Sequence, residues 1–111
     1  MADCIFCKIA SGEIPGKLVY QDDHVTAFRD LNPQAPTHVL LIPNHHVASI
    51  DELDDPELSF RLLRAARQVA SDEKLTGGWR LVTNVGPDSG QTVFHLHWHL
   101  LGGRQMSWPP G

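Results

Sequence analysis

Three histidines near the end of the chain, His95, His97 and His99, alternate with apolar residues in the segment FHLHWHLL, residues 94–101. A β-strand has a period of two, so we expect the three imidazoles on one face, about 7 Å apart, and the apolar residues on the other. Imidazole titrates near neutral pH, ligates metals, and attacks phosphorus and leaves from it readily. The row therefore predicts a metal site or nucleophilic and acid–base catalysis rather than a merely polar strand face.

A loop rich in glycine and polar residues precedes these histidines. Asn84 ends the preceding predicted strand, and Gly90, Gln91 and Thr92 follow in the stretch NVGPDSGQT. Backbone N–H groups exposed in a glycine turn, together with amide and hydroxyl side chains, can cradle an anion. Beside an imidazole row such a loop suggests phosphoryl chemistry, although its composition alone favours a plain connection.

Cys4 and Cys7 form a Cys-x-x-Cys pair. The N-terminus lacks the basic and apolar regions of a signal peptide, so a structural disulfide is not expected. No βαβ pattern precedes the pair, as a thioredoxin-like redox motif requires. Two interpretations remain: half of a metal site, or two small buried apolar residues.

The composition limits the classes of partner. The chain has 111 residues, a formal net charge of −4, 41% hydrophobic residues and 20% charged residues, which suits a single globular domain over 1–111. No apolar run approaches the roughly 20 residues that cross a membrane, and the charge gives no footprint for nucleic acid or acidic lipid. We expect a cytoplasmic protein with neither partner. Dinucleotide-binding and P-loop motifs are absent from the sequence.

The rest of the chain predicts the elements that position these residues. A short helix is expected over residues 4–10 with Asp3 as its N-cap, and a long one over 56–74 with Asp55 as its N-cap. Five strands are predicted, over residues 17–21, 25–29, 38–42 (buried, central and ended by Pro43), 79–84 and 94–101. Strands on both sides of one long helix indicate an α+β fold with a mostly antiparallel five-stranded sheet.

The segment HLHWHLL, residues 95–101, resembles the His-x-His-x-His pattern of the histidine triad (HIT) superfamily. The segments CIFCKIASGEIP, YQDDHVTAFRDLNPQAPTHVLLIP and GGRQMSWPPG resemble its histidine triad nucleotide-binding (Hint) branch, and the resemblance covers essentially the whole chain. It implies a homodimer in which two five-stranded sheets join into a ten-stranded sheet. It also implies a hydrolase that binds purine nucleotides and cleaves purine nucleoside phosphoramidates or aminoacyl-AMP-type conjugates.

The resemblance gives each site residue an expected role. His97 attacks the α-phosphorus to form a nucleotidyl-imidazole that water hydrolyses, and His99 contacts a phosphate oxygen and helps to protonate the leaving group. Asp30 binds the ribose hydroxyls. The expected phosphate contacts are the loop residues Asn84, Gly90, Gln91 and Thr92. The expected base pocket is apolar and consists of Ile5, Phe6, Ile9, Phe28 and Leu31. Each of these five apolar residues fits a protein core equally well.

The same resemblance includes prokaryotic-type members that carry the two cysteines and bind a structural zinc ion. It implies Cys4, Cys7, His46 and His95 as a closed Cys2His2 set, with His45 as the rival of His46. Animal-type members of the branch lack both cysteines, so this sequence mixes features of the two groups. No metal is expected to be required for the catalysis itself.

The tail, residues 102–111, is expected to cross to the partner subunit and bring Trp108 near its site. His24 is interpreted as a turn residue and His38 as a strand-edge residue, both without a role. Two alternatives to the phosphoramidate hydrolase stay open: a dinucleoside polyphosphate hydrolase, and a nucleotide- or zinc-binding regulatory module with weak catalysis.

Overall fold

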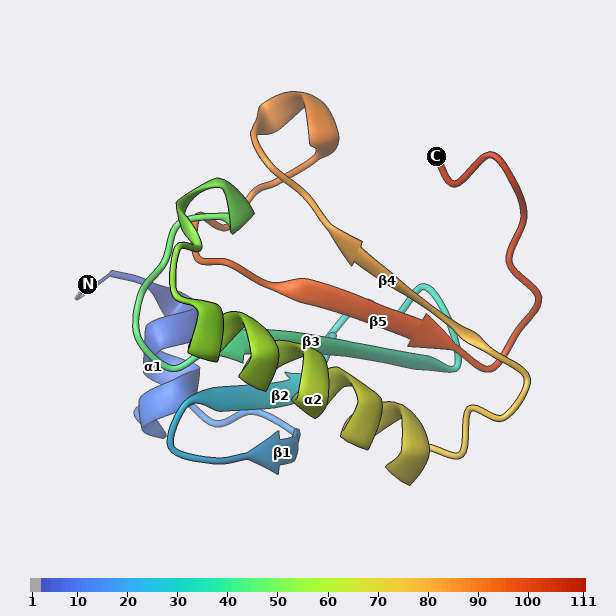
Figure 1. Cartoon of the computed structure of the whole chain (residues 1–111), viewed down its shortest axis with the longest axis horizontal. Helices are drawn as coiled ribbons and strands as arrows, with labels where there is room; N and C mark the ends of the chain where they lie inside the picture. The colour runs from blue at the N-terminus through green and yellow to red at the C-terminus, as the bar shows by residue number, and fades with distance from the viewer. Residues whose placement is uncertain (1–2) are drawn as a thin grey trace.

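The computed structural model describes residues 3–111 and places in them one five-stranded sheet and two α-helices (Figure 1). The elements are α1 (Ile5–Ser11), β1 (Leu18–Gln21), β2 (Val25–Arg29), β3 (Thr37–Pro43), α2 (Pro56–Asp72), β4 (Trp79–Thr83) and β5 (Trp98–Gly102), with short 3-10 turns η1 (Ile50–Glu52) and η2 (Pro87–Ser89). Neighbouring strands are antiparallel throughout, in the order β1-β2-β3-β5-β4. This confirms the predicted α+β class and its five-stranded sheet.

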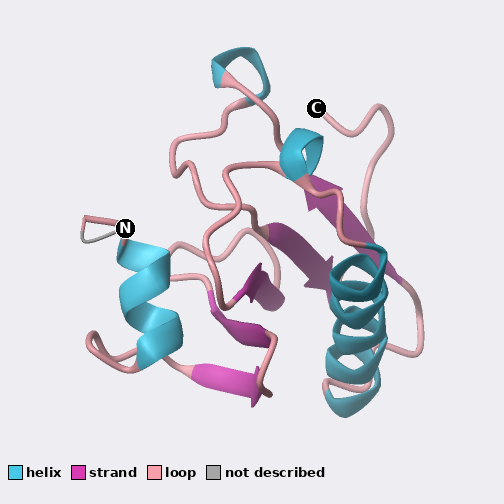
Figure 2. Cartoon of the chain, turned by 60° about the vertical axis from the view of Figure 1, so that its left-hand side comes forward, coloured by secondary structure: helices cyan, strands magenta, loops and turns pink. Residues whose placement is uncertain are grey.

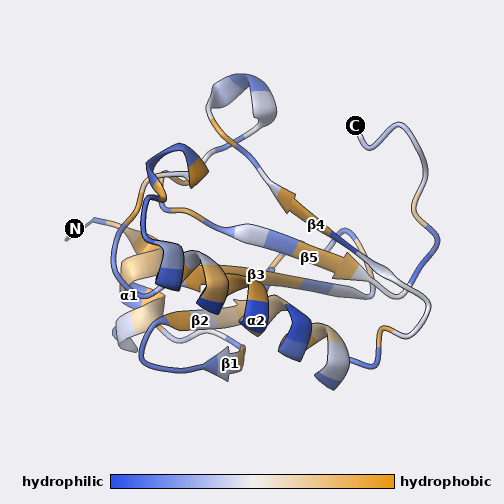
Figure 3. Cartoon of the chain, viewed as in Figure 1, coloured by the Kyte–Doolittle hydropathy of each residue, from blue (hydrophilic) through white to orange (hydrophobic). Residues whose placement is uncertain are grey.

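The central strand β3 is buried along its whole length, as its apolar sequence predicts. Val39 and Leu41 face α2, whereas Leu40 and Ile42 belong to a second cluster that includes residues of α1. The sheet thus lies between the two helices (Figure 2), and two of its three inner strands, β2 and β3, are largely apolar (Figure 3). The two faces of the sheet are therefore separate environments, one under each helix.

The long helix α2 begins where the sequence predicts. The Asp55 carboxylate accepts hydrogen bonds from the N–H groups of Glu57 and Leu58, and Pro56 occupies the first helical turn. The helix ends at Asp72 rather than at Lys74, because Lys74 adopts a left-handed conformation with φ of 57°. No helix in the described part of the chain is long and apolar enough to cross a membrane.

The short helix α1 differs from the prediction at its N-cap. Cys4, not Asp3, occupies that position, and its Sγ accepts a hydrogen bond from the N–H of Cys7 at 3.4 Å. The helix therefore begins one residue later than expected and presents both thiols at its first turn.

The last strand also differs from the prediction, since β5 begins at Trp98 and residues 94–97 lie outside the sheet. Their polar groups find other partners: the N–H of Leu96 donates to the carbonyl of Val47, and the His95 ring bonds the carbonyl of Pro43. Pro43 is the last residue of β3 rather than the first residue after it, and it pairs with Val25. The other predicted strands agree with the structure to within one residue at each end.

Candidate active site and metal centre

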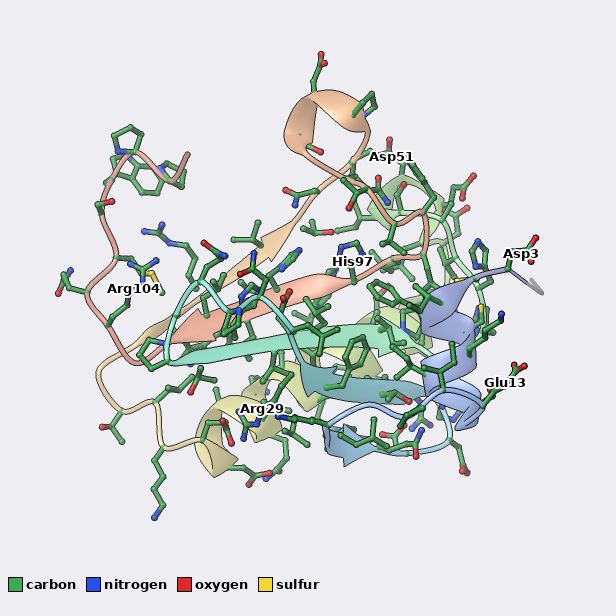
Figure 4. All side chains as sticks on the ribbon, turned by 180° about the vertical axis from the view of Figure 1, so that it is seen from behind. Asp3, Glu13, Arg29, Asp51, His97 and Arg104 are labelled. Carbon is green, nitrogen blue, oxygen red and sulfur yellow. The ribbon has the colours of Figure 1, made fainter. Side chains whose placement is uncertain are left out.

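His97 lies just before β5, on the face of the sheet opposite α2, as the view from behind shows (Figure 4). Leu96, Trp98 and Leu100 pack into the α2 core, so the alternation predicted from the sequence separates apolar from imidazole side chains. The His97 and His99 rings lie 5.1 Å apart between centroids. His95 instead turns toward the two cysteines, so the three histidines occupy three different environments.

The hydrogen bonds of His97 define its tautomer. Its Nδ1 lies 2.7 Å from the carbonyl oxygen of His95, an atom that only accepts, so Nδ1 carries the proton. The Nε2 atom of the neutral ring then carries a free lone pair, and the side chain is almost fully buried. This is the form of imidazole that acts as a nucleophile or a base.

A chain of hydrogen bonds defines the tautomer of His99 as well. The backbone N–H of Gln34 donates to His38 Nδ1 at 3.0 Å, so His38 carries its proton on Nε2. That nitrogen lies 2.9 Å from His99 Nδ1, which must accept, and the proton of His99 is therefore on its own Nε2. His99 therefore presents an N–H donor on a ring whose centroid lies 5.1 Å from that of His97.

Burial favours the neutral forms of His38 and His99. It lowers the pKa of His99 to about 4, helped by the neighbouring His97 and His38, and it lowers the pKa of His38 although the Asp30 carboxylate opposes this. The Asp30 carboxylate lies 3.4 Å from His38 Nε2. Asp30, His38 and His99 are close enough together for a metal ion, but both nitrogens of His38 are engaged in the hydrogen bonds described above.

A hollow of about 230 Å³ opens between α1 and β2. It is lined by all the residues predicted for the base pocket, Ile5, Phe6, Ile9, Phe28 and Leu31, together with Asp30 and with Pro15, Gly16, Lys17, Arg29 and Leu40. Phe6 connects this hollow to His97, because its ring packs edge-on against Phe28 at 5.5 Å and against His97 at 5.1 Å. Leu31 lines the same hollow yet is 95% exposed, which leaves its side chain free to cover a ligand.

The predicted phosphate loop divides into residues that build it and residues that remain free. The buried Gln91 side chain donates to the carbonyls of Ala48 and Val93 and accepts from the N–H of Gly86, so it holds the loop in shape. Gly90 ends η2 with φ of 96°, a conformation that glycine adopts without strain. Within residues 3–111, no protein hydrogen bond engages the Asn84 side chain or the N–H of Thr92. Both groups are therefore available to an anion.

The structure brings together the four predicted metal ligands. His95 Nδ1 lies 3.2 Å from Cys4 Sγ and 3.4 Å from Cys7 Sγ, and His46 Nδ1 lies 3.6 Å from Cys7 Sγ. Tetrahedral zinc with bonds of about 2.3 Å to sulfur and 2.0 Å to nitrogen separates such ligands by about 3.5 Å. The exposed His45 does not belong to this group.

The chemistry of the donors also fits zinc. His95 Nε2 bonds the carbonyl of Pro43 at 2.9 Å, so the proton is on Nε2 and the Nδ1 lone pair faces the thiols. Burial lowers the pKa of His95 to about 4, which keeps the ring neutral. Burial and the neighbouring Cys4 raise the pKa of Cys7, so metal binding at neutral pH has to displace a proton.

Sequence reasoning missed one residue of the site, since His38 is not a strand-edge residue. It is buried in the central strand and bonds both Gln34 and His99. The available signal was a histidine at the start of the apolar run HVLLI, because a titratable side chain in a buried strand requires a polar partner. Trp108, by contrast, is 81% exposed and stacks on Arg80 of its own chain, and it does not line the hollow between α1 and β2.

Comparison with known proteins agrees with this geometry. The model of the HIT domain matches residues 11–106. The 14 kDa zinc-binding protein of Brassica juncea is 49% identical, over 98% of this chain and all of that protein. The protein named adenylylsulfatase HINT1 of Arabidopsis thaliana is 48% identical, over 96% of this chain and 76% of that protein. A HIT family hydrolase of Legionella pneumophila, known from a crystal structure, is 53% identical over 98% of this chain and 100% of its own, with a TM-score of 0.95.

The domain match covers most of the chain, and the relatives are about half identical along nearly its full length. Their names describe hydrolases and zinc-binding proteins. The chain therefore belongs to the HIT domain family.

Proposed function

We propose that this protein hydrolyses purine nucleoside phosphoramidates, or similar nucleoside monophosphate conjugates, through a covalent nucleotidyl-histidine on His97. The observation that carries the proposal is the tautomer of His97. The His95 carbonyl holds the ring with its Nε2 lone pair free, next to the His99 N–H donor. A metal ligand or a plain core histidine does not require that pairing of a nucleophile with a donor.

In the first step, His97 Nε2 forms a bond to the α-phosphorus while the bond from phosphorus to the amine nitrogen breaks. The leaving nitrogen takes a proton from water as it departs, while the neutral His99, whose ring lies 5.1 Å from that of His97 between centroids, donates a hydrogen bond through its Nε2–H. In the second step, water attacks the phosphorus, the bond to His97 breaks, and the nucleoside monophosphate is released. The ring of His97 returns to its starting tautomer because its Nδ1 stays bonded to the His95 carbonyl.

Negative charge on the transferred phosphoryl group is met by hydrogen-bond donors rather than by cationic side chains. Candidate donors are the free N–H of Thr92, the Asn84 amide and His99 Nε2–H. Gly90 and Gln91 shape the loop that presents them. His99 has a pKa of about 4 in the free protein, so it acts there as a neutral hydrogen-bond donor, not as a charged acid.

The hollow between α1 and β2 supplies the recognition of the nucleoside. Its apolar walls suit the faces of a purine ring, and Asp30, between the hollow and His38, is placed to accept hydrogen bonds from ribose hydroxyls. We also propose a homodimer joined at β4, which is an edge strand with one unpaired side. In that dimer the tail, residues 102–111, brings Trp108 to the partner's site.

When zinc is bound by Cys4, Cys7, His46 and His95, it supplies a crosslink between α1, the loop after β3 and the segment before β5. The reaction itself is carried by the histidines and the phosphate loop. The names of the Brassica and Arabidopsis relatives support a zinc site and an adenylyl substrate, respectively. The cytoplasmic location stays a prediction.

The test is a pair of variants, His97→Ala and His45→Ala, assayed with an adenosine phosphoramidate. We expect His97→Ala to lose about a thousand-fold or more in kcat/KM, and the exposed His45→Ala to keep full activity. Rapid-quench mass spectrometry of the wild-type protein is expected to capture a chain heavier by one AMP group. Retained activity in His97→Ala contradicts the proposal. A diadenosine polyphosphate assayed in parallel decides whether such a compound is the better substrate.

A further inference from the structure

His95 is anchored at both its side chain and its backbone. Its ring contacts Cys4 Sγ and Cys7 Sγ through Nδ1 and bonds the Pro43 carbonyl through Nε2. Its own carbonyl oxygen accepts the hydrogen bond from His97 Nδ1 at 2.7 Å. The side chain is fully buried. One residue therefore connects the cysteine cluster directly to the nucleophile.

The backbone around His95 has little other support. Residues 94–97 lie outside the sheet, so strand pairing does not fix the orientation of the His95 carbonyl. The N–H of Leu96 donates the backbone hydrogen bond of this segment, to the carbonyl of Val47. The position of the carbonyl therefore depends on where the His95 ring is held.

We propose that the group Cys4, Cys7 and His46 positions the nucleophile, acting through His95, so that loading of this cluster with a metal ion sets the tautomer of His97. This inference rests on the proposed function for its consequence in catalysis, but not for its structural part. Cys4, Cys7 and His46 are positioning residues in this scheme, since the described contacts place none of them against His97.

The physical argument follows the hydrogen bond. With the cluster closed on a metal ion, His95 Nδ1 is bound, the ring cannot turn, and the carbonyl faces His97 Nδ1. When the cluster is opened, the ring keeps the Pro43 bond but loses the contacts on its Nδ1 side. The carbonyl is then free to move, and the proton of His97 is no longer confined to Nδ1. Molecules that carry it on Nε2 have no lone pair with which to attack phosphorus.

A purely structural zinc site makes a different prediction. It stabilises the fold, and removing it lowers the melting temperature, but the folded molecules that remain keep an intact nucleophile. Tautomer and reaction rate in the folded state therefore separate the two roles, whereas stability does not.

The experiment compares His46→Ala with His45→Ala, two neighbouring histidines of which one belongs to the cluster and the other is exposed. Cys7→Ser opens the cluster from its other side. Val69→Ala, a cavity variant in the distant α2 core, serves as the control for lost stability alone. Each protein is measured without substrate for zinc content and for the ¹⁵N resonances of the His97 ring, and with adenosine phosphoramidate for the rate of AMP transfer in a single turnover.

We expect the His97 ring to show the Nδ1–H tautomer in the wild type, His45→Ala and Val69→Ala, and mixed tautomers in the two cluster variants. Single-turnover AMP transfer is expected to fall about 10- to 100-fold in the cluster variants with little change in KM, a range typical of lost supporting shells around metal sites. Zinc loss with an unchanged His97 tautomer overturns the proposal, and so does a Val69→Ala rate loss equal to that of the cluster variants. A wild type that shows the tautomer coupling but never transfers AMP contradicts the proposed function instead.

Discussion

His38 on the central strand and His99 on the neighbouring strand β5 share a hydrogen bond of 2.9 Å between Nε2 and Nδ1. Through this bond the main chain controls which nitrogen of His99 carries the proton. Gln34 N–H fixes the tautomer of His38, and His38 fixes that of His99. The position of the His99 proton is therefore determined by a loop residue on the far side of His38.

This relationship predicts that His38→Ala lowers kcat more than it changes KM. Without its partner His99 can carry its proton on either nitrogen, and the hydrogen bond that orients its ring is lost. We expect a fall in kcat of about 10- to 100-fold, as for other residues that orient a reacting group. Steady-state kinetics with an adenosine phosphoramidate measure it, with the turn residue His24→Ala as the control. Equal losses in both variants contradict the assigned role.

The low pKa of His99 predicts how stability depends on pH. The folded ring has a pKa of about 4 and an unfolded histidine about 6.5, so between these values the unfolded chain binds more protons. The free energy of unfolding must then rise with pH in this window, and the contribution of His99 is lost as pH falls from 6.5 toward 4. The slope is about 1.4 kcal/mol per pH unit for this group.

Urea unfolding of the wild type and of His99→Gln at several pH values between 6.5 and 4.5 measures this contribution. The variant is expected to lose less stability on acidification, by about 1.4 kcal/mol per pH unit. Metal ligands titrate alike in both proteins and cancel in the comparison. Parallel stability curves for the two proteins are incompatible with a half-buried, neutral His99.

The strands and helices were predicted well from the sequence because the hydrophobic patterns that specify them involve residues close together in the chain. The apolar run of β3, the Asp55–Pro56 start of α2 and the alternation around His97 follow from residues close together in the chain. The errors in the predicted strand bounds arose where contacts between residues far apart in the sequence decide the local structure. Residues 94–97 leave the sheet since Val47 and Pro43 supply their hydrogen-bond partners.

In the candidate site, too, the sequence did not reveal contacts between residues that are distant in the chain. The resemblance to a known family placed His97, His99 and the four metal ligands, but spacing alone did not choose between His45 and His46. The role of His38 was invisible because its partners, Gln34 and His99, are identified only by the fold. Gln91 was expected to bind phosphate, yet its amide is used inside the loop.

Leu31 allows a test of the base pocket that is separate from stability. It lines the hollow but is 95% exposed, so Leu31→Ala is expected to change the free energy of unfolding by no more than about 0.5 kcal/mol. A purine ring that covers the side chain buries it, and loss of about 1–2 kcal/mol of that contact raises KM roughly 5- to 30-fold with kcat nearly unchanged. Leu18→Ala, also exposed but on β1 outside the hollow, is the matched control. An unchanged KM in Leu31→Ala places the base elsewhere.

The tail and Trp108 are expected to complete the partner's site, and mixed dimers test this directly. One chain carries His97→Ala with its tail intact, and the other keeps His97 but ends at residue 105. Each alone is expected to be nearly inactive, the second because no Trp108 reaches its site. In a mixed dimer the intact His97 receives a tail from its partner, so an equal mixture that pairs at random regains about a quarter of the wild-type activity.

A third chain, with both His97→Ala and Trp108→Ala, is the control for this complementation. This chain brings no Trp108 to the partner's site. Because the indole is 81% exposed and stacks on Arg80 of its own chain, its loss is expected to leave the fold intact. Its mixture with the truncated chain should therefore stay inactive, while native mass spectrometry shows that mixed dimers have formed. Full activity of the truncated chain alone, or mixed dimers that regain nothing, would mean that each subunit builds its site without the partner's tail.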